Sequence, residues 1–332
     1  MALRLPDKWV WDFWLARAES RHHVFYLQAP RSLGKPELRH YHASIGHAVS
    51  VDLTDWTVLP DALEPGPPGS WDDLATWTGS VLEHDGRWHM LYTGINRSER
   101  GLVQRIGLAV SDDLITWTKH RANPVLEAEP RWYELLDPER WRDQSWRDPC
   151  LFVDPDDGSL ACLITARSRD ADPSGAGVLA RARSRDLVQW EVLAPVTPTD
   201  EFAQVECPQL VLVDGQSLIL FSCHAEDHAP ARLSRLGRRC ETGTYVFAAD
   251  ELWGSYRASS EPVVPAAAAS GPLYAGKAVG DHAGRWSFIA FRGAADGDFT
   301  GELTDPLPLV IDADGVRVAR RPHLRRADVA PA

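Results

Sequence analysis

Ser111-Asp-Asp-Leu-Ile-Thr-Trp117 is one of three copies of a seven-residue pattern in this chain. The other copies are Ser50-Val-Asp-Leu-Thr-Asp-Trp56 and Ser184-Arg-Asp-Leu-Val-Gln-Trp190, so each reads Ser-x-Asp-Leu-x-x-Trp. Each copy follows a short β-prone run, such as Ile106-Gly-Leu-Ala-Val110. A unit that recurs every 60 to 75 residues or so is typical of a repeat architecture, and this weakens a two-domain interpretation.

A second repeat consists of five strands with alternating apolar residues, most of which follow a turn. Asp85-Gly86, Asp157-Gly158 and Asp214-Gly215 are strong hairpin signals, because glycine accepts positive φ at little cost. The five strands are His23-Val-Phe-Tyr-Leu-Gln28, Gly86-Arg-Trp-His-Met-Leu-Tyr92, Gly158-Ser-Leu-Ala-Cys-Leu-Ile164, Gly215-Gln-Ser-Leu-Ile-Leu-Phe221 and Gly284-Arg-Trp-Ser-Phe-Ile-Ala290.

Five such strands predict five blades, and four-stranded blades of roughly 45 to 70 residues fill the chain. We therefore expect an all-β fold, a five-bladed β-propeller that forms one catalytic domain over residues 1–332. The tail of about residues 322–332, rich in Arg, Ala and Pro, is expected to fray.

The composition restricts the functional class. The net charge is −12 and Lys and Arg form no long run, which argues against a nucleic-acid partner. No stretch approaches the ~20 apolar residues of a membrane span, and no secretory signal is recognisable. The five cysteines are odd in number and lack CxxC spacing, as in a reducing compartment. We predict a cytoplasmic protein without a membrane partner, a cofactor or a metal.

Three acidic residues are expected to share one pocket. Counting back 12 residues from Val24, Trp88, Leu160, Leu218 and Trp286 on the five strands gives Asp12, Thr76, Asp148, Glu206 and Tyr274. In a propeller the strand before this hairpin lines the central axis, so these side chains converge. Three converging acids repel one another, and no fold needs that for stability. The alternative is that each acid caps a turn or pairs with an arginine.

Two carboxyl groups that face one bond can cleave a glycoside, one as acid and the other as nucleophile or base. Glu206, next to Val205 and Cys207, suits the general acid/base, and Asp12, among aromatic residues, suits the nucleophile. Asp148 follows Arg147, whose charge keeps it anionic for stabilising an oxocarbenium-like centre. Tryptophan rings could contact sugar faces or pack between blades with equal plausibility: Trp11, Trp14 and Trp77.

Asp12, Arg147-Asp148-Pro149 and Glu206-Cys207-Pro208 resemble, in order, the three motifs of glycoside hydrolase families 32 and 68, the β-fructofuranosidases and levansucrases. Trp11-Asp12-Phe13-Trp14 is more similar to family 68. Other segments look like family 32: Phe25-Tyr26-Leu27-Gln28, Gly46-His47-Ala48-Val49-Ser50, Leu59-Pro60-Asp61-Ala62-Leu63 and Trp77-Thr78-Gly79-Ser80.

The resemblance covers about residues 9–293 and implies a five-bladed propeller, a retaining mechanism and a fructofuranosyl donor. It implies that Asp12 is the nucleophile, Asp148 the transition-state stabiliser and Glu206 the acid/base. The residues that we expect to bind the substrate are Trp11, Trp14, Gln28, Trp77, Thr78, Arg147 and Tyr274.

Two departures from the family pattern bear on the substrate. The family 32 nucleophile motif Trp-Met-Asn-Asp-Pro-Asn-Gly is absent beyond its Trp and Asp, and no β-sandwich is expected after the propeller. Both favour a small β-D-fructofuranoside such as sucrose or a short fructo-oligosaccharide, with hydrolysis and fructosyl transfer left open. The alternatives are a family 43-like arabinofuranosidase or xylosidase, and a non-catalytic carbohydrate-binding propeller.

Two insertions interrupt the repeat. In the first, residues 121–147, the segment Arg131 to Arg142 is expected to form a short helix over the pocket mouth. The second, residues 224–239, carries arginines that could bind a substrate phosphate or simply be solvated: Arg232, Arg235, Arg238 and Arg239. His224 and His228 have the spacing of metal ligands on a helix, but no second ligand pair accompanies them. Residues 262–271 read as an Ala-rich linker between blades.

Overall fold

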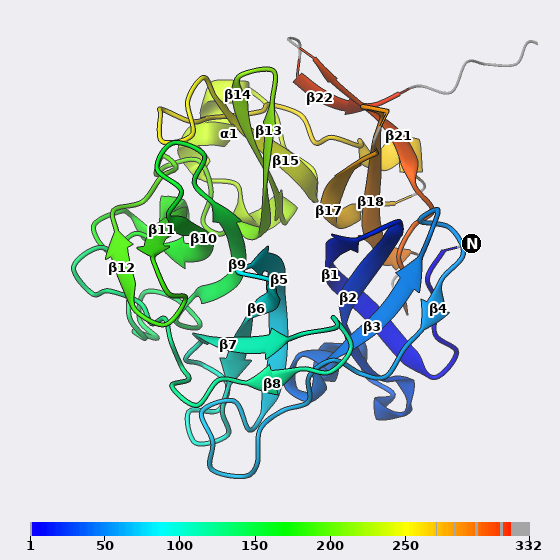
Figure 1. Ribbon diagram of the computed structural model, residues 1–332. Helices are drawn as coiled ribbons and strands as arrows, with labels where there is room; N and C mark the ends of the chain where they lie inside the picture. Colours follow the sequence, from blue (N-terminus) through cyan, green and yellow to red (C-terminus); the bar gives the residue numbers. More distant parts are fainter. Residues whose placement is uncertain (1, 270, 282, 296–297, 313–314, 320–332) are drawn as a thin grey trace, which may run out of the picture.

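The computed structural model describes residues 2–269, 271–281, 283–295, 298–312 and 315–319. Five four-stranded antiparallel sheets surround a central axis, so the predicted five-bladed β-propeller is confirmed (Figure 1). Within the described ranges no β-sandwich accompanies the propeller. Likewise, none of the helices in these ranges is long and apolar enough to span a bilayer.

Each blade runs from the axis outward along the chain, and we number the blades I to V. Blade I contains β1 (Lys8–Ala18), β2 (Arg21–Pro30), β3 (Ser44–Ser50) and β4 (Thr57–Val58). Blade II contains β5 (Ala75–His84), β6 (Arg87–Ile95), β7 (Arg105–Ser111) and β8 (Thr118–Lys119). Blade III contains β9 (Trp146–Val153), β10 (Leu160–Arg167), β11 (Gly177–Ser184) and β12 (Trp190–Leu193).

The last two blades follow the same plan with one interruption. Blade IV contains β13 (Glu206–Val213), β14 (Gln216–Cys223), β15 (Gly243–Ala249) and β16 (Arg257–Ala258). Blade V contains β17 (Leu273–Gly280), β18 (Trp286–Arg292), β21 (Leu307–Asp312) and β22 (Gly315–Val318). Between its second and third strands blade V inserts a two-stranded ribbon, β19 (Ala294–Ala295) and β20 (Asp298–Phe299).

The Ser-x-Asp-Leu-x-x-Trp repeat forms the turn between the third and fourth strands of blades I to III. In blade II the Asp113 carboxylate accepts the backbone N–H groups of Ile115 at 2.8 Å and Thr116 at 2.7 Å. These bonds lower the pKa of Asp113, since they stabilise its ionised form. Leu114 adopts φ 63° and is buried. The Trp117 indole N–H donates to the Leu114 carbonyl at 3.0 Å. The repeat is thus a turn motif that fixes the outer edge of each blade.

Each inner strand carries a β-bulge at the same level of the axis. The register shifts at Asp12 in β1, Thr78 in β5 and Asp148 in β9. It shifts at Cys207 in β13 and Ala275 in β17 as well. All of these residues except Thr78 have positive φ. A bulge turns the strand locally and re-aims its side chains, and the bulge residues Asp12, Thr78 and Asp148 line one cavity.

The predicted equivalence of five positions is therefore wrong in part. Asp12 and Asp148 are bulge residues, but Glu206 and Tyr274 each stand one residue before a bulge, and Thr76 stands two before Thr78. The count failed because its reference residues stand at different places in the second strands: Val24 is the fourth residue of β2, whereas Leu218 is the third residue of β14. In addition, β18 begins one residue sooner after β17 than β10 begins after β9.

Blade V closes directly against blade I without exchanging a strand. The Val10 N–H donates to the Gly301 carbonyl at 3.0 Å, and the Leu303 N–H donates to Leu3 at 3.0 Å. The Arg31 guanidinium spans the same junction, because it donates to the Thr300 carbonyl at 2.9 Å and the Lys8 carbonyl at 3.1 Å.

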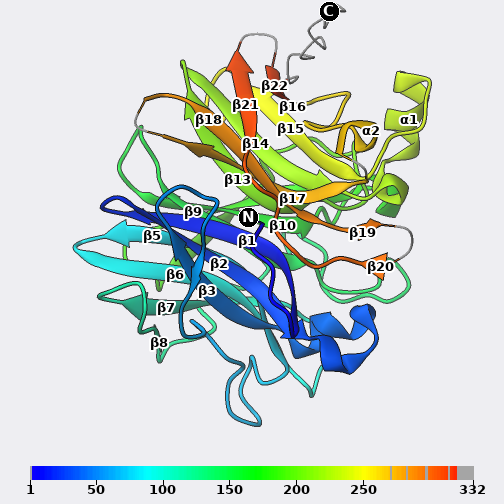
Figure 2. The same ribbon diagram turned by 90° about the vertical axis from the view of Figure 1, so that its right-hand side faces the viewer.

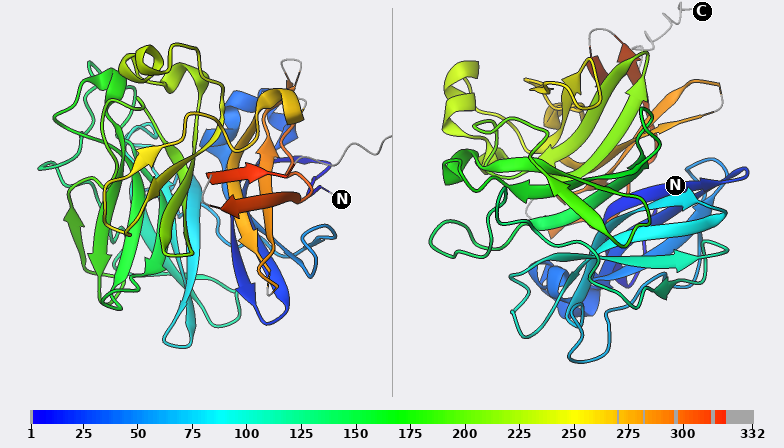
Figure 3. Two further views of the ribbon diagram at one scale, coloured as in Figure 1. Left: turned by 90° about the horizontal axis from the view of Figure 1, so that it is seen from above. Right: turned by 60° about the vertical axis from the view of Figure 1, so that its left-hand side comes forward.

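Several connections gather at one end of the propeller (Figures 2 and 3). They include the 3₁₀ helices between β2 and β3, the β19–β20 ribbon and the short helix after β14. The helical elements are η1 (Arg31–Leu33), η2 (Pro36–His42), η3 (Pro173–Gly175), η4 (Ala225–Asp227), α1 (Pro230–Leu236) and α2 (Ala266–Ala269).

The insertions differ from expectation in their local structure. The segment Arg131 to Arg142 contains turns and no helix. Glu134 there binds Arg140 at 2.8 Å and Arg167 at 2.7 Å, so ion pairs and turn bonds replace helical ones. The predicted linker 262–271 contains the single helical turn α2. The predicted frayed tail lies outside the described residues.

Candidate active site

A cavity of about 1100 Å³ opens at the end of the axis where the insertions gather. The three predicted acids Asp12, Asp148 and Glu206 all line it. Five of the predicted substrate-binding residues line the cavity as well: Trp11, Trp77, Thr78, Arg147 and Tyr274.

Two residues from the predicted binding set lie elsewhere. Trp14 lines a smaller cavity of about 410 Å³ at the opposite end of the axis, and it stacks on Phe25 at 6.1 Å. Because β1 alternates its side chains and bends at Asp12, Trp14 faces away from the acids. Gln28 is buried within blade I and donates to Ser44 at 3.2 Å. Both are corrections to the predicted site.

The buried carboxylate of Asp148 is held by two donors. The Thr165 hydroxyl donates to Oδ2 at 3.0 Å, and the Cys207 backbone N–H donates to the same oxygen at 3.0 Å. The backbone N–H of Asp148 in turn donates to the Thr93 hydroxyl at 3.1 Å. Three neighbouring blades therefore fix the orientation of this carboxylate, as a stabilising anion requires.

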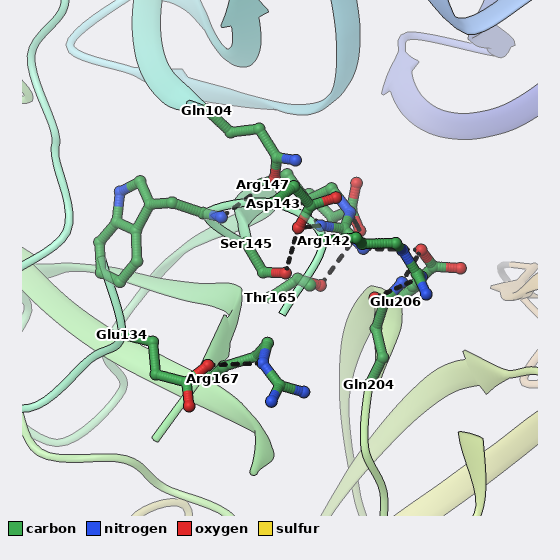
Figure 4. A network of polar contacts seen from close by, with 12 residues as sticks. Gln104, Glu134, Arg142, Asp143, Ser145, Arg147, Thr165, Arg167, Gln204 and Glu206 are labelled. Carbon is green, nitrogen blue, oxygen red and sulfur yellow. Dashed lines mark hydrogen bonds and ion pairs between the residues drawn. The ribbon is translucent and has the colours of Figure 1, made fainter. Parts of the chain in front are cut away.

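Glu206 is fully engaged with hydrogen-bond donors (Figure 4). Its Oε1 accepts from Arg147 at 2.8 Å and from the Gln204 amide, and its Oε2 accepts from the Tyr274 hydroxyl at 2.5 Å. Burial by itself raises the pKa of Glu206. Arg147, His224 and the Tyr274 hydroxyl outweigh burial and lower that pKa to about 2.

Asp12 has the opposite electrostatic environment. Burial, followed by the charges of Asp148 and Glu206, raises its pKa to about 7 against the opposing effects of Arg39 and Lys277. Lys277 is buried on the inner strand of blade V, where its ammonium donates to the carbonyls of Cys207 at 2.7 Å and Pro208 at 3.3 Å.

Sequence reasoning missed the residues that organise the acids. Gln104 accepts from Arg147 at 3.0 Å, and Arg142 donates to Gln204 at 2.8 Å (Figure 4). Arg142 comes from the insertion before β9, and Gln104 precedes β7. Neither stands at a repeat position, so no periodic signal pointed to them.

The arginines of the second insertion have partners within the protein. Arg232 and Arg235 both pair with Glu201, at 2.8 and 2.6 Å, and Arg238 pairs with Glu261 at 2.6 Å. These pairs give no support to the phosphate-binding alternative, and Arg232 is buried instead of solvated. Across the described part of the chain, no group of three His, Cys, Asp or Glu side chains could hold a metal. His224 instead lines the cavity and stacks on Tyr274, with ring centroids 4.6 Å apart.

The arrangement can supply an acid, a nucleophile and a stabilising anion to one bond. Its resting protonation is nevertheless reversed from the expected roles, since Asp12 shares its proton near neutral pH while Glu206 is ionised. Asp12 and Glu206 together retain one proton below about pH 7. Because the two carboxyl groups interact, this titration belongs to both of them and not to Asp12 alone.

Comparison with known proteins gives the family. The family model for the glycosyl hydrolases family 32 N-terminal domain matches residues 14–298. An insoluble β-fructofuranosidase isoenzyme of Arabidopsis thaliana is 27% identical over 318 residues, which is 91% of this chain and 54% of that protein. The chain thus spans about half the length of this curated relative.

Solved structures share the fold. An inulosucrase from Halalkalicoccus jeotgali bound to kestose superposes with a TM-score of 0.75 at 24% identity, covering 95% of this chain and 87% of that one. A family 32 β-fructofuranosidase of Bombyx mori gives a TM-score of 0.71 at 20% identity, covering 96% and 64%. Since the family match spans most of the sequence, the chain belongs to glycosyl hydrolases family 32.

Proposed function

We propose that the protein is a retaining glycosidase that acts on a small β-D-fructofuranoside such as sucrose or a short fructo-oligosaccharide. The convergence of Asp12, Asp148 and Glu206 in one cavity carries this proposal. The Arabidopsis relative is named a β-fructofuranosidase, and the Halalkalicoccus structure holds kestose, which supports the same substrate class.

In this mechanism the Asp12 carboxylate attacks the anomeric carbon and Glu206 protonates the leaving oxygen. Asp148, fixed by Thr165 and the Cys207 N–H, stabilises the developing positive charge. Water then hydrolyses the fructosyl ester with Glu206 as base; a sugar hydroxyl in place of water gives transfer.

NMR of the purified protein with sucrose and with 1-kestose tests the proposal. We expect release of fructose or formation of new fructosyl products, with β-fructofuranose detected first. Asp12→Asn and Glu206→Gln should each lower the rate by at least about 10³-fold, because each removes a group that bonds to or protonates the reacting atoms.

Asp112→Asn is the matched control, because Asp112 is exposed and forms an ion pair with Arg87 at the surface, away from the cavity. Absence of turnover of both sugars by the wild-type protein would refute the fructosidase proposal. Activity that survives in Asp12→Asn would remove Asp12 from the nucleophile role.

We also propose a cytoplasmic location. All five cysteines are unpaired, and four of them are buried, which fits a reducing compartment. Cell fractionation followed by immunoblotting tests this, and recovery of the protein from the medium would contradict it.

A further inference from the structure

Arg39 is a cavity residue whose function the three-acid mechanism leaves open. It lies on η2, the 3₁₀ helix between the second and third strands of blade I, and it lines the cavity of the acids. It falls in an insertion between repeat strands, so the repeat pattern gave no reason to select it.

Two aromatic rings hold the guanidinium from opposite ends of the chain. Its Cζ lies 4.1 Å from the ring centroid of Phe299 in the blade V ribbon and 5.4 Å from that of Trp11 in blade I. Such stacking fixes the plane of the guanidinium while leaving its N–H edge available. Phe299 and Trp11 both line the cavity, so Arg39 is held at the cavity wall.

The protein accepts only some of the hydrogen bonds that the Arg39 guanidinium can donate. Its one hydrogen bond among the described residues goes from Nη1 to the Pro36 carbonyl at 2.9 Å, and its Nε is buried without a partner. The indole N–H of Trp11 is buried as well and has no hydrogen-bond partner among the residues that the structure describes. A buried donor without a partner loses the hydrogen bonds that it would make to water, which is unfavourable. Two such donors that belong to adjacent cavity residues therefore indicate a ligand that supplies acceptor oxygens.

The charges around Arg39 indicate which acceptor it takes. Asp12, Glu37 and Glu206 are the anions that act on the guanidinium, yet none forms an ion pair with it in the part of the chain that the structure describes. An added phosphate or carboxylate would meet these three negative charges. A sugar hydroxyl accepts a hydrogen bond without adding charge.

We propose that Arg39 is a substrate-binding residue that donates hydrogen bonds to hydroxyl oxygens of the neutral glycosyl unit seated against Asp12. This inference rests on the proposed function and adds to it that the unit is unphosphorylated. Because the wall comes from η2 and the β19–β20 ribbon, blades I and V together select the sugar.

Steady-state kinetics of Arg39→Lys and Arg39→Met with sucrose and 1-kestose provide the test. Lysine keeps the charge but lacks the Nε–H and the planar fork, so both variants should raise KM by about 10- to 100-fold, with a smaller change in kcat. Arg131→Lys is the matched control, since Arg131 stacks on Trp132 at 4.7 Å, is exposed and does not line the cavity. Its KM should stay within about twofold of the wild type.

Fructosides that lack a single hydroxyl group identify which hydroxyl Arg39 binds. With the analogue that lacks the bound hydroxyl, Arg39→Lys and the wild type should have equal KM values, as in a double-mutant cycle. An unchanged KM for Arg39→Lys with sucrose and 1-kestose would overturn the inference while the fructosidase proposal stands. Preference of the wild type for a phosphorylated fructoside, lost in Arg39→Lys, would also overturn it.

A binding measurement separates the two proposals if turnover is absent. Calorimetric titration of Glu206→Gln with 1-kestose, alone and combined with Arg39→Lys, should show a comparable 10- to 100-fold loss of affinity. A wild-type protein that neither cleaves nor binds either fructoside would overturn both proposals.

Discussion

At the residue scale, the protonation of two carboxyl groups decides the chemistry. Asp12 has a pKa of about 7 and Glu206 of about 2, although the proposed roles require the proton on Glu206. Between these values Asp12 and Glu206 together hold one proton, and that proton favours Asp12 over Glu206. A substrate that draws Arg147 away from Glu206 would raise the pKa of Glu206 and shift the proton toward Glu206.

The pH dependence of kcat/KM follows from this sharing. The active form carries one proton on the pair, and that proton is lost as the pH rises through the raised pKa of Asp12 at about 7. We therefore expect kcat/KM to hold steady below pH 7 and to fall about tenfold per pH unit above it. NMR of ¹³C-labelled aspartate should show one carboxyl titrating near pH 7 that is missing in Asp12→Asn.

The substitution Lys277→Met tests whether the charge of Lys277 lowers the pKa of Asp12. The buried ammonium lowers the pKa of Asp12, so its removal should move the alkaline limb of kcat/KM to higher pH. Lys8→Met, which removes a lysine that pairs with Asp61 outside the cavity, should leave the limb in place. If the alkaline limb of kcat/KM in Lys277→Met is unchanged or lies at lower pH than in the wild type, this account is wrong.

The sequence allowed the three acids to be found, but not their supports. Asp12, Asp148 and Glu206 were located by counting back from the alternating strands that follow them and by their resemblance to the family motifs. Arg39 and Gln204 lie in connections, and connections follow no periodicity that predicts which way a side chain points. Their role depends on contacts between distant segments, such as Phe299 against Arg39.

At the scale of the element, two local features shape the blades. The inner strand of each blade contains a bulge, and the outer edge of blades I to III contains the repeated turn. The turn was visible as a repeat because its side chains bond within a few residues of sequence. The bulge was invisible because it depends on pairing with the next strand, and counting a fixed number of residues back from that strand misplaced Glu206 and Tyr274 by one residue.

Asp113→Ala tests the turn. It removes the acceptor for two backbone N–H groups and should lower the stability by about 1 kcal/mol, or the melting temperature by about 2 °C. Because the folded-state pKa of Asp113 is depressed, its contribution exists above the unfolded pKa and disappears as the pH falls through the folded one. The difference from the wild type should therefore vanish in strong acid.

Asp112→Ala is the control for the turn, because Asp112 is a neighbour of Asp113 whose surface ion pair with Arg87 contributes little to stability. Thermal melts should place it within about 1 °C of the wild type. Equal effects of the two alanine variants would show that the turn bonds of Asp113 contribute nothing specific.

At the scale of the whole molecule, the ring depends on one junction. Blades I and V meet through single backbone bonds, such as Val10 to Gly301, instead of a strand shared between them. Gly301 has φ 62°, and a Cβ at that position would lie 2.8 Å from the Trp9 ring. The five-bladed ring was predictable from the count of repeats, whereas the way in which it closes was not.

Gly301→Ala should loosen this junction. Alanine pays about 1 kcal/mol for positive φ, and the overlap with Trp9 adds about 1–3 kcal/mol. Hydrogen exchange should speed up first in β1 and β18, which flank the junction. Gly284→Ala measures the cost of positive φ without the steric overlap, since Gly284 has φ 73° and a Cβ added there would have no atom within 4 Å. A loss of stability in Gly301→Ala no larger than in Gly284→Ala would show that the junction tolerates the contact.

The closing junction also sets when the site can exist during synthesis. Asp12 is on the first blade to leave the ribosome, whereas Tyr274, Lys277 and Phe299 belong to the last. A nascent chain therefore carries the proposed nucleophile before it carries the residues that orient and tune the site. If the proposed activity is present, partly translated products that lack blade V should not show it.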